Sequence, residues 1–204
     1  YNPPAGLEWV DVASIEALEA GTENTLKFRL MFTDATAAVL EAEPGETGSF
    51  KITITPDSDS QTAYFRLKPR CDSREAFYGL GEYFDHVNHR GKIRAMQIEV
   101  APYESGYNEA HVPVPFVIGT NAWGIFVDSR YPGVFDMAAK EDDLVDITFG
   151  TGLASKDGLV FHLFADDHPL DITRHYYEVS GFPRLPAPWA PGPLVWRDEN
   201  RDQA

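Results

Sequence analysis

Residues 26–32 read LKFRLMF, and an apolar side chain occupies every second position of this stretch. Because successive side chains of a β-strand point to opposite faces, this alternation predicts a strand with one buried and one solvated face. Residues 50–54 (FKITI) and 145–149 (VDITF) repeat the pattern. The sequence therefore predicts a fold built largely from half-buried strands.

Further strands are predicted where short apolar runs lie between turn signals. The runs are residues 114–118, 124–127 and 159–164, and the turn signals are residues 43–45, 56–59, 119–121 and 156–158. Short uninterrupted apolar runs are typical of more deeply buried strands. Many short strands at close spacing indicate an all-β fold, an antiparallel β-sandwich or barrel, because a βαβ fold would need a helix between successive strands.

Two helices are also predicted. One is a short segment over residues 14–20. The other begins after Asp167 or His168, either of which can cap it, and has Pro169 at its first position and Gly181 just past its end. Proline at the start of a helix and glycine after its last residue are the usual end signals.

A proline-rich stretch, residues 183–193, follows the second helix. Since proline lacks a backbone donor, we expect a stiff connector there rather than a helix or a central strand. Residues 194–197 (LVWR) then read as a short strand of another domain. The pattern predicts a β-sandwich domain over residues 1–183, followed over residues 184–204 by a linker and the first strand of a second domain.

Composition and charge limit the partners. The chain has 204 residues, 43% of them hydrophobic, and a formal net charge of −15. An acidic chain argues against a nucleic-acid partner, because phosphate contacts need clustered Lys and Arg. No run approaches the roughly 18 apolar residues that span a bilayer, so no membrane partner is expected. The local exception is Arg90, Lys92 and Arg94, which on a strand would share one face, either a solvated face or a binding rim.

The motifs predict no cofactor and no metal. Gly79-x-Gly81 lacks the third glycine of a dinucleotide fingerprint and the lysine of a phosphate loop. We interpret it as a bulge, or a close approach of two backbones, where strands meet. His86 and His89 are three residues apart, but no third ligand follows at the spacing of a zinc site.

Residues 99–116 form the segment most strongly marked for function. They read EVAPYESGYNEAHVPVPF, a long loop that ends in a predicted strand. Long loops without structure of their own usually carry function. Tyr103 and Tyr107 offer flat faces of the kind on which sugars stack. Partners for sugar hydroxyls would be Glu99, Glu104 and Asn108. The alternative is a loop that packs between domains and touches no sugar.

Four motifs occur in a fixed order: residues 77–82 (FYGLGE), residues 99–102 (EVAP) with 114–116 (VPF), residues 124–129 (GIFVDS) and residues 181–186 (GFPRLP). Together they resemble the N-terminal, galactose-mutarotase-like β-sandwich domain of glycoside hydrolase family 31, the family of α-glucosidases and α-xylosidases. The resemblance covers roughly residues 77–189. Residues 108–111 depart from the family's usual spacing, and residues 191–197 are unlike its usual start of the catalytic domain, which indicates a divergent branch.

The resemblance implies that the chain is an accessory domain in front of a catalytic (β/α)8 barrel. In this family's retaining hydrolysis of α-glycosides, one carboxylate attacks the anomeric carbon while a second protonates the leaving oxygen. Both carboxylates are expected downstream of Ala204. No catalytic residue is therefore assigned to this chain, which should be inactive alone and should have its own downstream barrel as a partner.

The same resemblance assigns substrate-binding residues. The family's equivalent of residues 99–116 helps to shape the substrate pocket, which implies contacts with an α-glycoside for Glu99, Ala101 and Tyr103. Trp196 is assigned to the same pocket, with Arg197 as the alternative, because active sites of barrels gather at the C-terminal ends of their strands.

Three other functions stay open. A non-catalytic carbohydrate-binding module would bind sugar by itself through Tyr103 and Tyr107. A mutarotase-type epimerase, which shares the sandwich class, would use a histidine with a carboxylate to move a proton at the anomeric carbon. By residue type its candidates are His86, His111, His162, His168 and His175. A purely structural sandwich would contact no sugar at all.

Overall fold

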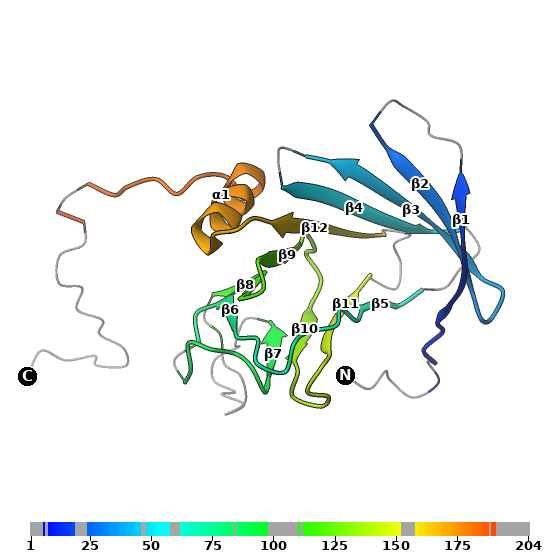
Figure 1. The fold of residues 1–204 in the computed structure, drawn as a ribbon, viewed down its shortest axis with the longest axis horizontal. Coiled ribbons are helices and arrows are strands. Elements are labelled where there is room, and N and C mark those ends of the chain that lie inside the picture. The colour runs from blue at the N-terminus through cyan, green and yellow to red at the C-terminus, as the bar shows by residue number, and fades with distance from the viewer. Residues whose placement is uncertain are drawn as a thin grey trace, which may run out of the picture.

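The computed structural model describes residues 6, 8–18, 24–45, 48–57, 62–83, 85–97, 110, 112–151, 158–187 and 189–190. These residues form two antiparallel β-sheets and one α-helix, as Figure 1 shows. No helix among them is both long and apolar enough to cross a membrane.

The larger sheet has eight strands and the smaller sheet four. In spatial order, the larger sheet contains β1 (Val12–Leu18), β2 (Leu26–Phe32), β3 (Ala37–Pro44), β4 (Ser49–Pro56), β12 (Leu159–Ala165), β9 (Trp123–Val127), β8 (Pro113–Gly119) and β6 (Phe77–Gly81). The smaller sheet contains β5 (Tyr64–Leu67), β11 (Val145–Gly150), β10 (Gly133–Met137) and β7 (Lys92–Met96). The predicted all-β, antiparallel fold is confirmed, and its arrangement is that of a β-sandwich.

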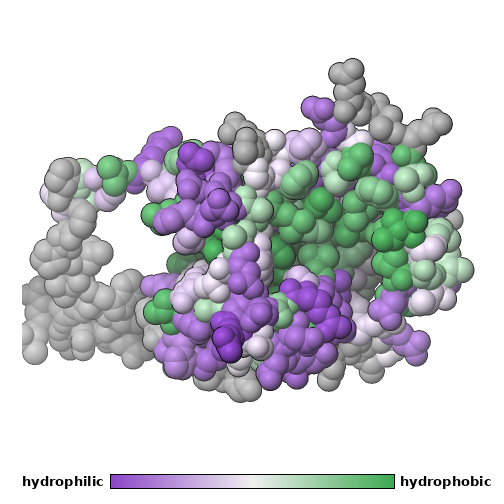
Figure 2. Space-filling model, viewed as in Figure 1, coloured by the Kyte–Doolittle hydropathy of each residue, from purple (hydrophilic) through white to green (hydrophobic). Residues whose placement is uncertain are grey.

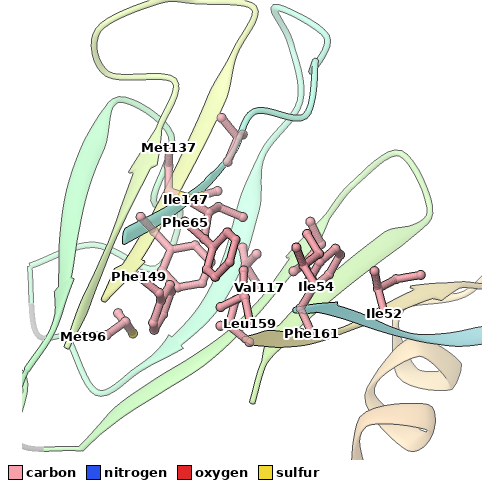
Figure 3. Close-up of a cluster of buried hydrophobic side chains, with 14 of the residues drawn as sticks. Ile52, Ile54, Phe65, Met96, Val117, Met137, Ile147, Phe149, Leu159 and Phe161 are labelled. Atoms are coloured by element: carbon pink, nitrogen blue, oxygen red, sulfur yellow. The ribbon is translucent and has the colours of Figure 1, made fainter. Parts of the chain in front are cut away.

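One hydrophobic core joins the two sheets (Figure 3). The larger sheet contributes Ile52, Ile54, Val117, Leu159 and Phe161, and the smaller sheet contributes Phe65, Met96, Met137, Ile147 and Phe149. At its centre, the rings of Phe135 and Phe149 pack edge to face with their centroids 5.7 Å apart. Both side chains are buried, and pairs of this geometry add to the stabilisation that burial alone provides.

The larger sheet is too wide for the smaller one to cover. Leu26 pairs with Ala42 and therefore lies on the same face as the core, yet it is 60% exposed. Phe50, two residues before the core residue Ile52 on β4, is 51% exposed. Figure 2 shows this open hydrophobic surface on the side of the molecule where β1 to β4 lie. The opposite face of these strands is polar and carries the ion pairs Lys27–Glu41, Arg29–Asp57 and Lys51–Glu43.

The helix α1 (Pro169–Ser180) forms where its end signals predict it. His168 is the N-cap, and its Nδ1 accepts the backbone N–H of Leu170 at 3.2 Å. Gly181 takes a φ of 97° after the last turn, and its N–H donates to the carbonyl of Tyr177 at 2.8 Å. That positive φ is the reason a glycine is needed at this position.

The helix packs on the outer face of the larger sheet, away from the smaller sheet. Ile172 is fully buried there against Phe116 and Phe164. Tyr176 stacks on Phe116 with ring centroids 4.2 Å apart. Strands β8, β9 and β12 are therefore covered on both faces, which explains why their sequences read as uninterrupted apolar runs rather than as alternating ones.

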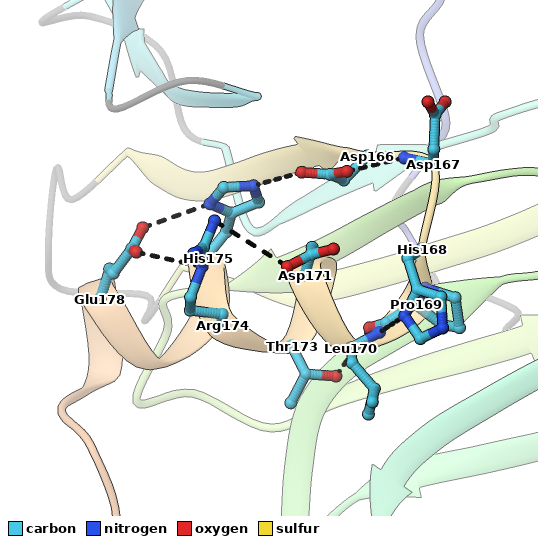
Figure 4. Close-up of polar contacts among 10 residues, drawn as sticks. All are labelled: Asp166, Asp167, His168, Pro169, Leu170, Asp171, Thr173, Arg174, His175 and Glu178. Atoms are coloured by element: carbon cyan, nitrogen blue, oxygen red, sulfur yellow. Dashed lines mark hydrogen bonds and ion pairs between the residues drawn. The ribbon is translucent and has the colours of Figure 1, made fainter.

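A histidine held between two carboxylates fastens the helix to the end of β12 (Figure 4). The Nε2 of His175 lies 3.0 Å from Oδ2 of Asp166, and its Nδ1 lies 3.2 Å from Oε2 of Glu178. Because a carboxylate only accepts hydrogen bonds, both ring nitrogens must donate, and the ring is a charged imidazolium. Burial acts to lower the pKa of His175, but the hydrogen bonds and charges of Asp166 and Glu178 outweigh it and raise that pKa.

The helix predicted over residues 14–20 is wrong. Residues Val12–Leu18 form the edge strand β1, which pairs with β2 from Val12↔Phe32 to Leu18↔Lys27. All seven of its residues are exposed. Pairing with β2 supplies the backbone hydrogen bonds that a helix would otherwise make, so a contact distant in sequence overrides the local pattern.

The packing of α1 predicts different costs for two neighbouring substitutions. Ile172→Ala should lower the free energy of unfolding by about 2–5 kcal/mol, because it leaves a cavity between helix and sheet. Leu170→Ala, at a position that is 71% exposed, is the matched control and should change it by less than about 0.5 kcal/mol. Urea unfolding of the chain measures both, and equal losses would show that α1 does not rest on Ile172.

The contacts of His175 with Asp166 and Glu178, called the His175 clamp below, predict a pH-dependent stability of the fold. The raised pKa means that the folded state holds the proton of His175 more tightly than the unfolded state does, where the value is about 6.5. The stabilisation is therefore complete below about pH 6.5 and is lost as the pH rises through the folded-state pKa. We expect the difference in unfolding free energy between wild type and His175→Gln to shrink as the pH rises above about 6.5. A difference that is constant or grows over this range contradicts the charged clamp.

Candidate functional site

The four residues assigned to the substrate pocket are Glu99, Ala101, Tyr103 and Trp196, and all four lie outside the residues that the structure describes. The described part contains the two strands that flank the segment of interest. Strand β7 ends at Met96, and β8 begins at Pro113 and includes the predicted strand residues Val114–Phe116. The candidate site is therefore built from the end of the sandwich where β6, β7 and β8 meet.

An irregular backbone marks β6 at this end. Gly79, Leu80 and Gly81 have successive positive φ angles of 111°, 64° and 96°. The register slips at this point, since Gly79 pairs with Val117 but Gly81 pairs with Pro113. A Cβ on Gly79 would collide with the carbonyl oxygen of Phe116. The interpretation of Gly79-x-Gly81 as a bulge with close backbone approach is thus confirmed.

The edge of β6 that does not pair with β8 is covered by residues 88 and 89. The side chain of Asn88 accepts the N–H of Phe77 at 3.1 Å, and the N–H of His89 donates to the carbonyl of Phe77 at 2.9 Å. The ring of His89 continues this cover, with Nε2 at 2.9 Å from the carbonyl oxygen of Gly79. Backbone groups that an edge strand would expose are therefore paired within the chain.

A buried arginine, Arg94, forms a hydrogen bond with the ring of His89. Arg94, on β7, is 2% exposed on its side chain. Its Nε donates to Nδ1 of His89 at 3.1 Å, and its Nη2 donates to Oδ1 of Asp85 at 2.7 Å. The guanidinium carbon lies 4.3 Å from the ring centroid of Tyr83, whose hydroxyl donates to the carbonyl of Ala95 at 2.8 Å.

These contacts settle the proton states in the cluster. Arginine only donates, so Nδ1 of His89 is an acceptor and its Nε2 carries the proton that bonds to Gly79. The neutral ring agrees with its lowered pKa, which burial causes and the charge of Arg94 reinforces. Burial likewise raises the pKa of Tyr83 to about 12, so its hydroxyl stays protonated. The carboxyl of Asp85 has a lowered pKa because it accepts from Arg94.

A metal site is not formed by the described residues at this end. Both ring nitrogens of His89 are engaged, so it is unavailable to pair with His86 as a zinc ligand. Among the residues that the structure describes, no group of three or more His, Cys, Asp or Glu side chains could hold a metal ion.

The three cations predicted to share a strand face have separate roles. Arg90 donates to the carbonyls of Asp72 and Glu75, both at 3.0 Å, and so ties a turn together. Lys92 lies 3.7 Å from Asp85, and Arg94 is buried between the sheets. Among the described residues, these three cations therefore do not form a single solvated basic face or basic binding rim.

Three of the described histidine candidates for mutarotase-type proton transfer make structural contacts. Both nitrogens of His175 are occupied within a buried clamp, and His168 caps α1. His162 is buried and stacks on Phe126 with ring centroids 5.8 Å apart. His111 lies outside the described residues.

The sequence did not predict the cluster of half-exposed Asp85 with the buried side chains of His89 and Arg94. The three residues lie within ten positions of one another, a weak signal for contact. Nothing in the sequence shows that β7 turns its arginine toward the core instead of toward solvent.

Comparisons with known proteins agree with this fold. The family described as "Glycosyl hydrolase 31 N-terminal galactose mutarotase-like domain" matches residues 14–136. An isomaltosyltransferase of Sporosarcina globispora is 25% identical over 126 residues, which are 62% of this chain and 11% of that protein. An α-glucosidase of Saccharolobus solfataricus is 27% identical over 135 residues, which are 64% of this chain and 19% of that protein.

A solved structure has the same fold. The cycloalternan-forming enzyme from Listeria monocytogenes, in complex with a pentasaccharide substrate, superposes with a TM-score of 0.77. The match covers 89% of this chain and 23% of that enzyme, at 16% sequence identity. The chain therefore corresponds to a small part of much longer proteins.

The bulge of β6 predicts that Gly79 cannot be replaced. Gly79→Ala should destabilise the chain by clearly more than the roughly 1–2 kcal/mol that a positive φ costs an L-residue, because its Cβ also meets the backbone of β8. Gly91→Ala is the matched control, since Gly91 has a φ of 74° with no atom within 4 Å of an added Cβ. Thermal or urea unfolding of both variants makes the comparison. Equal losses would mean that the close approach of β6 to β8 is unimportant.

Proposed function

The chain belongs to the glycosyl hydrolase 31 N-terminal galactose mutarotase-like domain family, and we propose that it is the accessory N-terminal domain of a retaining α-glycosidase. The longer protein that carries it is called the parent protein below. The catalytic work is assigned to a (β/α)8 barrel downstream of Ala204. This chain contributes the interface with that barrel and one wall of the substrate pocket.

The observation that carries this proposal is the exposed apolar segment that follows α1. Leu185 is 96% exposed and Trp189 is 82% exposed, and Phe182 is also exposed. Figure 1 shows the chain after α1 running away from the sandwich. Large apolar side chains gain about 25 cal/mol for each Å² removed from water, so a segment of this kind favours a covering partner.

The covering partner proposed is the rest of the same polypeptide. The relatives named above are five to nine times longer than their matched segments, since those segments are 19% and 11% of their lengths. We place the division as first predicted, with the sandwich over residues 1–183 and, over residues 184–204, the linker and first barrel strand.

The wall of the pocket is assigned to residues 99–116 and to Trp196. This segment runs from the end of β7 to β8, two strands fixed within the sandwich. Tyr103 supplies an aromatic face, Glu99 a hydroxyl partner and Ala101 a small contact surface for the sugar. Carbohydrate binding is supported by the relative solved with a pentasaccharide.

The chemistry is divided between the two domains. In a retaining mechanism, a nucleophilic carboxylate forms a covalent glycosyl intermediate and an acid carboxylate protonates the leaving oxygen, about 5–5.5 Å apart. Both are assigned to the barrel. This chain orients the sugar and excludes water from one side of it.

Hydrolysis of a panel of aryl α- and β-glycosides, by the parent protein and by this chain in parallel, tests the proposal. We expect release from at least one α-glycoside by the parent protein and none by the chain alone. Hydrolysis by the chain that is lost on changing one of its own carboxylates contradicts the accessory role. Inactivity of both proteins, together with saturable sugar binding by the chain, would instead favour a carbohydrate-binding module.

A further inference from the structure

The buried arginine is costly unless it has a specific task. Arg94 lies opposite Phe135 in the register of β7 and β10, so it points into the core between the sheets. Removing a guanidinium from water is unfavourable, and apolar residues in its place are often at least as stable. Here Asp85, the ring of Tyr83 and Nδ1 of His89 compensate for the lost water.

The contacts of Arg94 lead by short steps to the start of β8. Arg94 holds His89 in the tautomer that donates from Nε2, and this proton bonds to the carbonyl of Gly79. Gly79 begins the run of positive φ angles that allows Glu82 N–H to reach the carbonyl of Val112 at 3.0 Å. Val112 stands immediately before β8.

A second branch reaches the end of β7. The ring of Tyr83 lies against the guanidinium of Arg94, and its hydroxyl binds the carbonyl of Ala95. Ala95 is the residue before the last of β7. The same buried cation therefore braces the end of β7 and the start of β8, the two strands that residues 97–112 connect.

We infer that Arg94, acting through His89 and Tyr83, is a positioning residue that sets the backbone at the end of β7 and the start of β8. This inference rests on the proposed function, in which these strands present one wall of the pocket to an α-glycoside. Because both side chains are buried, we assign no sugar contact to Arg94 or His89. Their role is to fix the direction in which the chain leaves and re-enters the sandwich.

Arginine and a neutral histidine suit this task because neither changes its charge near neutral pH. Arginine stays protonated in proteins, and its fork can hold two acceptors in a fixed geometry. Burial, and then the positive charge of Arg94 beside Nδ1, lower the pKa of His89 and so oppose its protonation. The Asp85 carboxyl faces this charge, and Lys92 lies on the outer side of Asp85. The hydrogen bonds from Arg94 to His89 and from His89 to Gly79 should therefore persist over the pH range in which His175 titrates.

The test compares two substitutions of His89 in the parent protein. His89→Leu removes both the donor and the acceptor, whereas the carboxamide of His89→Gln can still accept from Arg94 and donate to Gly79. His162→Leu is the matched control, because His162 is also a buried histidine but stacks on the opposite face of the larger sheet. The first readout is amide hydrogen exchange in peptides that cover residues 77–83 and 112–118.

We expect His89→Leu to speed exchange in those two peptides by about ten-fold or more, because it removes the hydrogen bonds that join Arg94 to Gly79. Exchange in residues 145–150 should be unchanged. His89→Gln should lie near wild type, and His162→Leu should leave both peptides unchanged. If His89→Leu fails to fold, Asp85→Asn offers a milder loss at a half-exposed position and should raise exchange in the same peptides. Unchanged exchange in a folded His89→Leu protein overturns the inference.

The second readout is the kinetics of the parent protein on its best aryl α-glycoside. A wall that contacts the sugar equally in the ground and transition states contributes uniform binding. His89→Leu should therefore raise KM by about ten-fold or more and change kcat by less than about two-fold. Faster exchange with an unchanged KM would keep Arg94 as a positioning residue and would instead contradict the pocket wall of the proposed function.

Discussion

The rest of the structure depends on how an eight-stranded sheet with an apolar inner face is covered by a sheet of only four strands. The smaller sheet buries its aromatic residues, Phe135 and Phe149 above all, against β4, β12, β9 and β8. The helix α1 covers the outer face of the last three of these strands. Burial is therefore concentrated on β4, β12, β9 and β8, while Leu26 on β2 and Phe50 near the start of β4 stay in contact with water.

Two histidines show how neighbours decide proton state in this protein. His175 lies between two carboxylates and is charged, so it fastens α1 most strongly at low pH. His89 lies beside the guanidinium of Arg94 and is neutral, so its hydrogen bond to the β6 bulge does not depend on pH in the same range. Both histidines hold a segment through which the chain leaves the sandwich, but His175 does so as a cation and His89 as a neutral ring.

Much of the fold could be predicted because its signals are local. The alternation in residues 26–32 marks β2, and Pro169 with Gly181 bounds α1. The edge strand β1 was misassigned as a helix because only its pairing with β2 makes it a strand. For the same reason, the position of β12 between β4 and β9 could not be predicted from pattern.

At the candidate site, the two glycines predicted the bulge, but the burial of Arg94 depends on which face of β7 turns inward. The pocket residues Glu99, Ala101, Tyr103 and Trp196 lie outside the described residues and stay predictions.

The central claim is that this sandwich is one part of a larger glycosidase and docks on it through the segment after α1. The most direct measurement is the thiol reactivity of Leu185→Cys, in a Cys71→Ser background, in this chain and in the parent protein. Leu185 is 96% exposed here, so the account predicts the full rate of an exposed thiol in the chain and strong protection in the parent protein. Equal reactivity in both would contradict the account, because the apolar segment would then have no partner to cover it.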